Sequence, residues 1–272
     1  MKYGWKRDIT DPRDFKSSYK PEEGLSNSCD LRALMPDIYN QGHLGSCTSN
    51  AIAALIESDL KRQELFDFMP SRLFIYYNER DLENTVGEDS GAQIRDGMKT
   101  INNLGIAPET YWPYSDSNPG PFSEKPPATA YQEAKKNVVT SYARVDQDEM
   151  AIKNCLSSKK PIVFGFTVYD SFETQAVTDT GIVPMPKNGE NILGGHAVLI
   201  IGFDDTTRRF LVRNSWGTNW GDNGYFTMPY EYVLDSNLSN DFWTIDMIVE
   251  SSVPQLSLWE RFIKFLEDVF IA

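Results

Sequence analysis

The sequence predicts an α+β fold with a mainly helical first half and a mainly β second half, built as one large domain or as two sub-domains that share a cleft. Apolar residues recur at helical spacing in three segments of the first half. Short β-branched and aromatic runs, bounded by Gly, Pro, Asp or Asn, occupy the second half. A proline-rich connection separates the halves. A chain of 272 residues is long enough to bury a full core.

The first predicted helix begins at Cys47 and ends near Arg62. Cys47, Ala51 and Leu55 recur every four residues, which places the sulfur at the head of this helix and on its inward face. Similar spacing predicts two further helices, over residues 71–82 and 93–104.

The connection over residues 112–134 contains prolines, glycine and serines, which are typical of turns and loops. Beyond it we expect five strands, over residues 162–168, 197–203, 209–213, 225–228 and 243–250. These elements divide the chain into four parts: an N-terminal arm (1–28), a helical sub-domain (29–118), a β sub-domain (119–252) and a C-terminal helix (253–272).

Composition excludes several classes of function. The net charge of −13 argues against binding nucleic acid through its phosphates. Three cysteines are too few for a disulfide framework, and neither histidine lies near a cysteine pair, so we expect no metal site and no cofactor. Residues 1–19 lack the apolar core of a secretory signal. A reducing compartment, such as the cytoplasm, fits best. The alternative is a protein that is secreted, either after its signal is trimmed or by a non-classical route.

The N-terminal arm sets aromatic residues among charges of both signs, which leaves two interpretations. The arm is either a solvated leader or an extended strap whose aromatic side chains dock on the folded body. Its aromatic residues are Tyr3, Trp5, Phe15 and Tyr19.

The last twenty residues form an amphipathic pattern at helical spacing, with an apolar side and a net acidic polar side. This helix could pack on its own domain, or form a partner or dimer contact. Insertion at a membrane surface is disfavoured, because anionic lipid repels an acidic face.

A lone cysteine is more often a buried structural residue than a nucleophile, so a catalytic role for Cys47 requires further groups. The head of a helix favours the thiolate, but a base, an orienting group and oxyanion donors are also needed. His43 lies in a glycine turn and should be exposed, whereas His196 begins a buried strand. Asn214 ends a strand that could pair with the His196 strand, so its side-chain oxygen could accept a hydrogen bond from the imidazole. Trp216 could cover that hydrogen bond and keep water away from it.

Three motifs in this order resemble the papain-like cysteine peptidases: Q-G-H-L-G-S-C, G-H-A-V and N-S-W-G-T-N-W-G-D-N-G-Y-F. The resemblance covers roughly residues 29–250. It implies a helical sub-domain and an antiparallel, β-barrel-like sub-domain with the active site in the cleft between them. It also implies Cys47 as nucleophile, His196 as base and then acid, and Asn214 as the orienting residue. Gln41 would supply an oxyanion donor, together with the Cys47 N–H.

The D-S-G-A segment at 89–92 resembles the family's segment that hydrogen-bonds the substrate backbone. Ser90, Gly91, Gly195 and Trp216 are therefore the candidate substrate-binding residues.

The chain also departs from the usual family pattern. Leu44 stands where relatives have a disulfide cysteine, Thr48 replaces a tryptophan, and Gly195 replaces an Asp or Asn. We also expect the chain to lack the long helical prodomain of many relatives, because only about 25 residues precede the apparent body. These departures indicate a divergent branch of bacterial, archaeal or viral type.

The implied function is that of a cysteine endopeptidase, a hydrolase that cleaves peptide or protein substrates through an acyl-enzyme. Two alternatives keep the same residues: an exopeptidase, amidase or transpeptidase, or a non-catalytic papain-fold binding protein with an occluded cleft. The arm then has a specific interpretation as a short propeptide or plug laid along the cleft, as in a zymogen.

Overall fold

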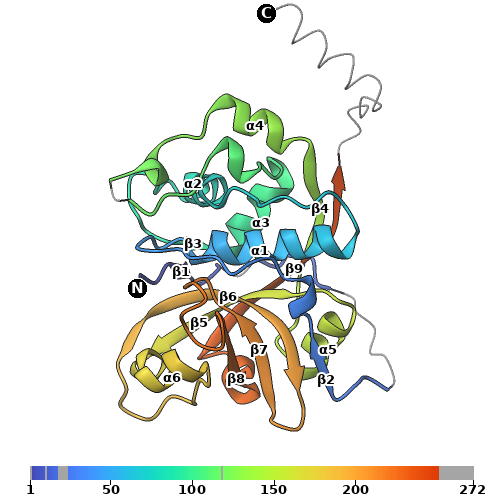
Figure 1. Ribbon diagram of the computed structural model, residues 1–272, viewed down its shortest axis with the longest axis vertical. Helices are drawn as coiled ribbons and strands as arrows, with labels where there is room; N and C mark the ends of the chain where they lie inside the picture. The colour runs from blue at the N-terminus through green and yellow to red at the C-terminus, as the bar shows by residue number, and fades with distance from the viewer. Residues whose placement is uncertain (1, 10, 18–23, 118, 251–272) are drawn as a thin grey trace, which may run out of the picture.

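The computed structural model describes residues 2–9, 11–17, 24–117 and 119–250, which form a layer of helices above a curved sheet (Figure 1). The helix expected over 253–272 lies outside the described residues, and so does Tyr19. No helix in the described part of the chain is long and apolar enough to cross a membrane. None of the three cysteines, which all lie in the described part of the chain, forms a disulfide.

Three helices make up most of the upper layer: α1 (Cys47–Arg62), α2 (Arg72–Leu82) and α3 (Ile94–Asn103). Each begins and ends within one residue of the bounds expected from the sequence. Helix α1 is buried from Cys47 to Leu60, because it lies between the other two helices and the sheet. Ser71 caps α2, since its hydroxyl oxygen accepts a hydrogen bond from the N–H of Phe74 at 3.1 Å.

The lower layer is a seven-stranded, antiparallel sheet in the order β4-β9-β5-β6-β7-β8, with β2 also paired to β6. All five expected strands are present. The sheet strands are β2 (Ser28–Asp30), β4 (Asn137–Arg144), β5 (Ile162–Tyr169), β6 (Ile192–Asp204), β7 (Arg209–Arg213), β8 (Tyr225–Pro229) and β9 (Ser239–Glu250).

The sequence did not indicate β4 or the shorter helices. These helices are α4 (Ala128–Ala134), α5 (Glu149–Ser157), α6 (Gln175–Thr180) and α7 (Tyr230–Leu234). Single 3-10 turns occur at Arg32–Leu34, Glu109–Tyr111, Pro121–Ser123 and Asp170–Glu173.

The packing does not divide at residues 118 and 119, where the sequence suggested a boundary. Helix α4 belongs to the helical layer, because its Ala130 and Ala134 are buried in one cluster with Phe74. Strands β4 and β9 also continue upward beside α3 (Figure 1), where the side-chain amide of Asn102 donates to the carbonyl of Val139 at 2.7 Å. One long pair of strands therefore joins the two layers.

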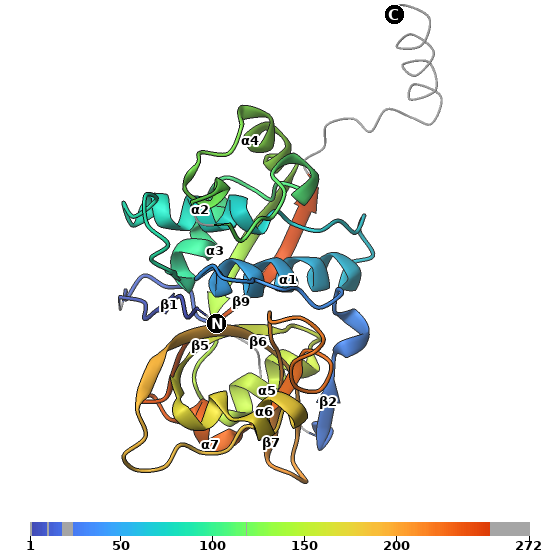
Figure 2. The ribbon, with the colours of Figure 1, turned by 60° about the vertical axis from the view of Figure 1, so that its left-hand side comes forward.

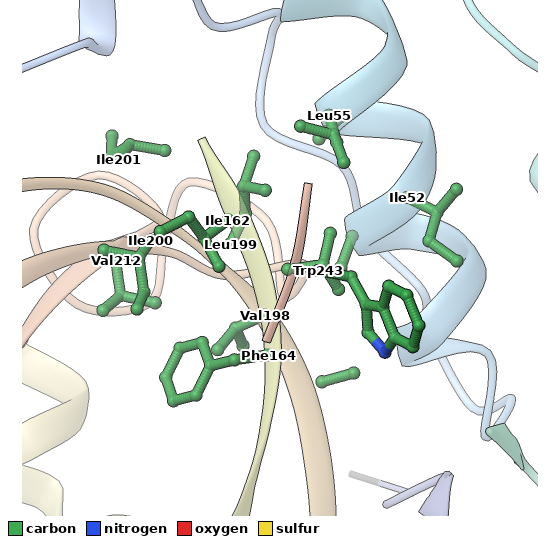
Figure 3. Packing of buried hydrophobic residues seen from close by; sticks show 14 of the residues in the cluster. Ile52, Leu55, Ile162, Phe164, Val198, Leu199, Ile200, Ile201, Val212 and Trp243 are labelled. Atoms are coloured by element: carbon green, nitrogen blue, oxygen red, sulfur yellow. The ribbon is translucent and has the colours of Figure 1, made fainter. Parts of the chain in front are cut away.

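One continuous apolar core joins α1 to the sheet. Leu55 of α1 points toward the strands, where Leu199 of β6 and Trp243 of β9 belong to the same buried cluster (Figure 3). This shared core holds the head of α1 at a fixed place over β6.

The N-terminal arm lies against the junction of the two layers (Figure 2). Its strand β1 (Trp5–Lys6) pairs in parallel with β3 (Ala92–Gln93). Further along, Lys16 pairs with Arg144 at the edge strand β4. Phe15, one of the aromatic residues considered for docking, is instead 77% exposed.

Candidate active site

Cys47 is the first residue of α1, and its side chain is completely buried beside β6. Its Sγ atom accepts a hydrogen bond from the backbone N–H of Ala197 at 3.4 Å. The turn that precedes it is tied to the sheet sub-domain, because the N–H of Gln41 donates to the carbonyl of Ser215 at 2.8 Å. The sulfur therefore lies where the helical layer meets the sheet, at a helix terminus that favours its thiolate.

His196 lies on β6, one residue before the amide that reaches the Cys47 sulfur. Its Nε2 atom is 2.9 Å from Oδ1 of Asn214, which follows β7, the antiparallel neighbour of β6. The indole of Trp216 stacks on the imidazole, with ring centroids 4.8 Å apart and an interplanar angle of 29°. Because Nε2 is engaged with Asn214, Nδ1 remains the free ring nitrogen, and it has no hydrogen-bond partner within the described residues. His43, by contrast, is exposed.

The Gln41 side chain is fully buried and fixed at both ends of its amide. Its Oε1 atom accepts a hydrogen bond from the Ser215 hydroxyl at 2.7 Å. Its Nε2 atom donates to the carbonyl of Leu44 at 2.9 Å and to the carbonyl of Lys2 at 3.2 Å. The second contact places a peptide carbonyl on the donor that the sequence assigned to the oxyanion.

Burial favours the neutral forms of both titrating groups in this site. It raises the pKa of the Cys47 thiol to about 11, against the backbone N–H groups of Ala197 and Gly4, which lower it. Burial likewise lowers the pKa of His196 to about 4, against its hydrogen bond to Asn214, which raises it. The neutral thiol and imidazole are therefore favoured while the site is covered.

The arm supplies that cover. Tyr3 lies beside the imidazole of His196 and the indole of Trp216, at ring-centroid distances of 6.0 and 6.1 Å. The carbonyl of Gly4 accepts a hydrogen bond from the N–H of Ala92 at 2.8 Å. The turn before Cys47, residues 41–46, is named the catalytic turn. Gly4 passes so close to it that a Cβ atom on Gly4 would lie 1.7 Å from the carbonyl oxygen of Gly45. Only glycine fits this passage.

The four candidate substrate-binding residues all border the arm. A Cβ atom on Gly195 would lie 2.5 Å from the Trp5 carbonyl oxygen, and one on Gly91 would lie 2.0 Å from the Gly4 carbonyl oxygen. The Ser90 hydroxyl accepts from the Lys6 ammonium at 3.2 Å. With Trp216 beside Tyr3, these residues line the path of the arm through the site.

A second group of contacts, which we name the arm anchor, attaches the arm to the body at a place distant from the cysteine. It consists of Asp8 and Asp14 from the arm and Arg95, Arg144 and Asp241 from the body. Arg144 pairs with Asp8 at 2.9 Å and with Asp14 at 2.8 Å. Arg95 pairs with Asp14 at 2.5 Å. The N–H of Asp8 donates to the Asp241 carboxylate at 2.7 Å.

The charges of the arm anchor do not cancel, because three carboxylates face two guanidinium groups. Burial, followed by the charge of Asp241, raises the pKa of Asp8. Hydrogen bonds from Trp243 and the Arg95 backbone, together with the charge of Arg144, oppose that rise. The Asp8 carboxyl is completely buried, so its partners on the body determine how firmly this part of the arm is held.

The site contains functional candidates that sequence reasoning did not single out. Ser215 lies in the N-S-W-G motif and Asp89 in D-S-G-A, but the prediction assigned functions only to neighbouring residues in these motifs. Asp89 is the first residue of D-S-G-A, and both its oxygens lie within hydrogen-bond distance of the Gly45 N–H. Asp8 carried no sequence signal, since its importance depends on burial against residues far away in the chain.

Comparison with known proteins identifies a matching family model and several similar sequences. A family model described as papain family cysteine protease matches residues 25–241. An uncharacterized peptidase C1-like protein, L477 of Acanthamoeba polyphaga mimivirus, is 53% identical over 220 residues, which cover 78% of this chain and 70% of the relative. Pro-cathepsin H of Medicago truncatula is 27% identical over 212 residues, which cover 72% of this chain and 54% of the precursor.

Among solved structures, xylellain, a cysteine protease from Xylella fastidiosa, superposes with a TM-score of 0.83 at 43% identity. The match covers 90% of this chain and 96% of xylellain. Procathepsin L 3 of Tenebrio molitor superposes with a TM-score of 0.68 at 18% identity, over 86% of this chain and 75% of that chain. At that identity the likeness shows the fold alone.

Proposed function

This chain belongs to the papain family of cysteine proteases, and on that premise we propose that it is an endopeptidase held in check by its own N-terminal arm. The observation that carries this proposal is the Lys2 carbonyl oxygen, which lies 3.2 Å from the Gln41 side-chain nitrogen. A site that holds one peptide carbonyl on its oxyanion donor is shaped to hold another.

In the proposed reaction, the Cys47 thiolate attacks the carbonyl carbon of the substrate. The carbonyl oxygen becomes an oxyanion that accepts hydrogen bonds from Gln41 Nε2 and the Cys47 N–H. The His196 imidazolium gives its proton to the departing amine, which leaves an acyl-enzyme. His196 then takes a proton from water, the resulting hydroxide attacks the acyl carbon, and the C–S bond breaks. Asn214 orients the imidazole through its 2.9 Å contact.

The course of the arm supports cleavage within a chain rather than at its end. Tyr3 lies beside His196 and Trp216. Two residues later, Trp5 pairs with Ala92 of β3. The arm thus passes the site as one continuous segment from Lys2 to Trp5, which supports a site that accepts the interior of a polypeptide.

The arm lies in this path without presenting a good electrophile. The Cys47 sulfur faces N–H donors, those of Ala197 and Gly4, and burial raises the pKa of its thiol to about 11. A neutral thiol is a poor nucleophile. We therefore assign the arm the role of an inhibitory segment that must leave before substrate enters.

The test is covalent labelling of the full-length chain with a peptidyl epoxide, followed by intact mass and peptide mapping. We expect slow labelling at Cys47, faster labelling in Trp5→Ala, and none in Cys47→Ala. Cys29 is a half-buried thiol with a raised pKa, so Cys29→Ser controls for labelling elsewhere.

Peptide turnover separates the possible outcomes. Turnover that persists in Cys47→Ala would refute the assignment of the nucleophile. If Cys47 resists labelling in both the full-length chain and Trp5→Ala, the chain is instead a papain-fold binding protein. Profiling with end-blocked and free peptides distinguishes an endopeptidase from an exopeptidase.

A further inference from the structure

Lys2 makes two contacts with the candidate active site. Its carbonyl oxygen lies on Gln41 Nε2 at 3.2 Å, and its ammonium group lies on the Asp89 carboxylate at 2.5 Å. Asp89 is almost completely buried, with 2% of its side chain exposed, whereas 43% of the Lys2 side chain is exposed. The arm thus places a cation on a carboxylate that belongs to the wall of the cleft.

Asp89 is held rigidly by neutral donors from the body. Its Oδ1 atom accepts from the Tyr76 hydroxyl at 2.5 Å and from the Gly45 N–H at 3.0 Å. The loop before it is also fixed, because the buried guanidinium of Arg80 donates to the carbonyls of Val86 at 3.0 Å and Glu88 at 2.7 Å. Such a prepared carboxylate needs little reorganisation to bind a cation.

Lys2 forms an ion pair with this carboxylate, whose charge also acts on the buried guanidinium of Arg80. Within the described residues, no other lysine or arginine forms an ion pair with Asp89. When the arm leaves, this carboxylate loses the cation that pairs with it. Buried charges are costly unless they are paired, so the open cleft should attract a positive group to this place.

The position of the Lys2 carbonyl determines which substrate residue would meet Asp89. A carbonyl oxygen and the Cα atom beside it are only about 2.4 Å apart in standard geometry. Any residue whose carbonyl occupies the Gln41 site therefore begins its side chain close to where Lys2 does. The long, flexible stem of a lysine or arginine can reach the same carboxylate whichever way the chain runs.

We propose that Asp89 is the specificity residue that selects lysine or arginine on the acyl side of the scissile bond. This inference rests on the proposed peptidase function, since it names the substrate class of the same site. Lys2 acts as the arm's own mimic of that substrate side chain. Hydrogen bonds to charged groups contribute enough for a selectivity of about 10-fold to 100-fold over a neutral side chain of similar length.

The experiment uses two peptidyl acyloxymethyl ketones that differ only beside the ketone, with lysine in one and norleucine in the other. The Cys47 thiolate displaces the carboxylate leaving group and forms a thioether, which intact mass detects. Rates are measured on full-length Trp5→Ala, alone and combined with Asp89→Asn. We expect the lysine probe to react at least about tenfold faster in the parent and within about twofold of norleucine in Asp89→Asn.

Asp116→Asn is the matched control. Asp116 also supports the catalytic turn through a backbone amide, because its carboxylate accepts from the His43 N–H at 3.1 Å. It forms no ion pair with Lys2, so Asp116→Asn should keep the preference for lysine. If Asp89→Asn slows both probes equally, Asp89 only supports the turn and the inference is wrong.

The remaining outcomes separate this inference from the proposed function. Equal rates for the two probes in the parent, with Cys47 labelled by both, overturn the specificity inference and leave the peptidase proposal standing. Absence of labelling by either probe overturns both. If Asp89→Asn does not fold, the lysine-to-norleucine ratio of the parent at low and high salt decides the matter, because a preference for charge must weaken with salt.

Discussion

Gln41 holds the carbonyl oxygen of Lys2 with the same amide that its other contacts keep in place. Nε2 donates to Lys2 at 3.2 Å and to Leu44 at 2.9 Å, while Oε1 accepts from the Ser215 hydroxyl at 2.7 Å. An amide fixed in this way cannot turn its oxygen toward an oxyanion. The interaction with Ser215 thus sets the polarity of the site before any substrate arrives.

Gln41→Ala should reduce kcat of the released enzyme by about 10²-fold to 10³-fold, the usual cost of removing one oxyanion donor. Ser215→Ala should have a smaller effect, because the amide stays present but loses one of the contacts that orient it. Steady-state kinetics on a fluorogenic peptide measure both. An unchanged kcat for Gln41→Ala, with labelling of Cys47 intact, would remove Gln41 from the transition state.

Opening the cleft should move the alkylation of Cys47 to lower pH. Burial raises the pKa of the thiol to about 11 and lowers that of His196 to about 4, and access of water reverses both changes. We expect the pH midpoint for iodoacetamide alkylation to be lower in Trp5→Ala than in the full-length chain. Cys29 should have the same midpoint in both proteins, and equal midpoints at Cys47 would contradict the prediction.

The same pKa changes of His196 and Cys47 determine how docking of the arm depends on pH. Docking lowers the pKa of His196, so the imidazole of the open site must lose its proton before the arm can dock. The contribution of this group to docking is therefore present above the imidazole's ordinary pKa, and it is lost as the pH falls. Docking raises the pKa of Cys47, so the contribution of the thiol is present below its open-site pKa and is lost toward pH 11.

Much of this architecture could be predicted from local patterns. The spacing of Cys47, Ala51 and Leu55 placed α1 correctly, because a helix with one inward face leaves a periodic signal. The motifs around Gln41, His196 and Asn214 pointed to the residues that the fold brings together. Such motifs are informative because the local backbone and the chemistry constrain the same few positions.

The rest depends on contacts between distant segments, which leave little local signal. Strand β4 was not predicted, because it follows a proline-rich stretch and only part of its length is buried. The arm anchor was invisible for a different reason. Asp8 resembles any surface aspartate in the sequence, and only the fold brings Arg144 and Asp241 to it.

Asp8→Ala should release the arm and speed labelling of Cys47 in the full-length chain. The Asp8 carboxylate is completely buried and pairs with Arg144 at 2.9 Å. Asp8→Ala leaves the buried indole N–H of Trp243 without its acceptor at 2.8 Å, and an unsatisfied buried donor costs about 1–3 kcal/mol, enough for a labelling rate about tenfold higher. Asp11→Ala is the matched control, because Asp11 pairs with Arg13 inside the arm. Equal labelling of the two variants would show that the anchor contributes nothing to docking.

Gly4→Ala should open the cleft by a purely steric route. The added Cβ atom would lie 1.7 Å from the Gly45 carbonyl oxygen, which is backbone and cannot rotate away. The arm must therefore move until this distance exceeds 3.0 Å, which also withdraws Tyr3 from His196. We expect faster labelling of Cys47 and cleavage of the arm by a trace of added protease. Gly87→Ala provides the control, since a Cβ atom there meets nothing within 4 Å. A Gly4→Ala chain that labels as slowly as Gly87→Ala would mean that the arm does not limit access to the sulfur.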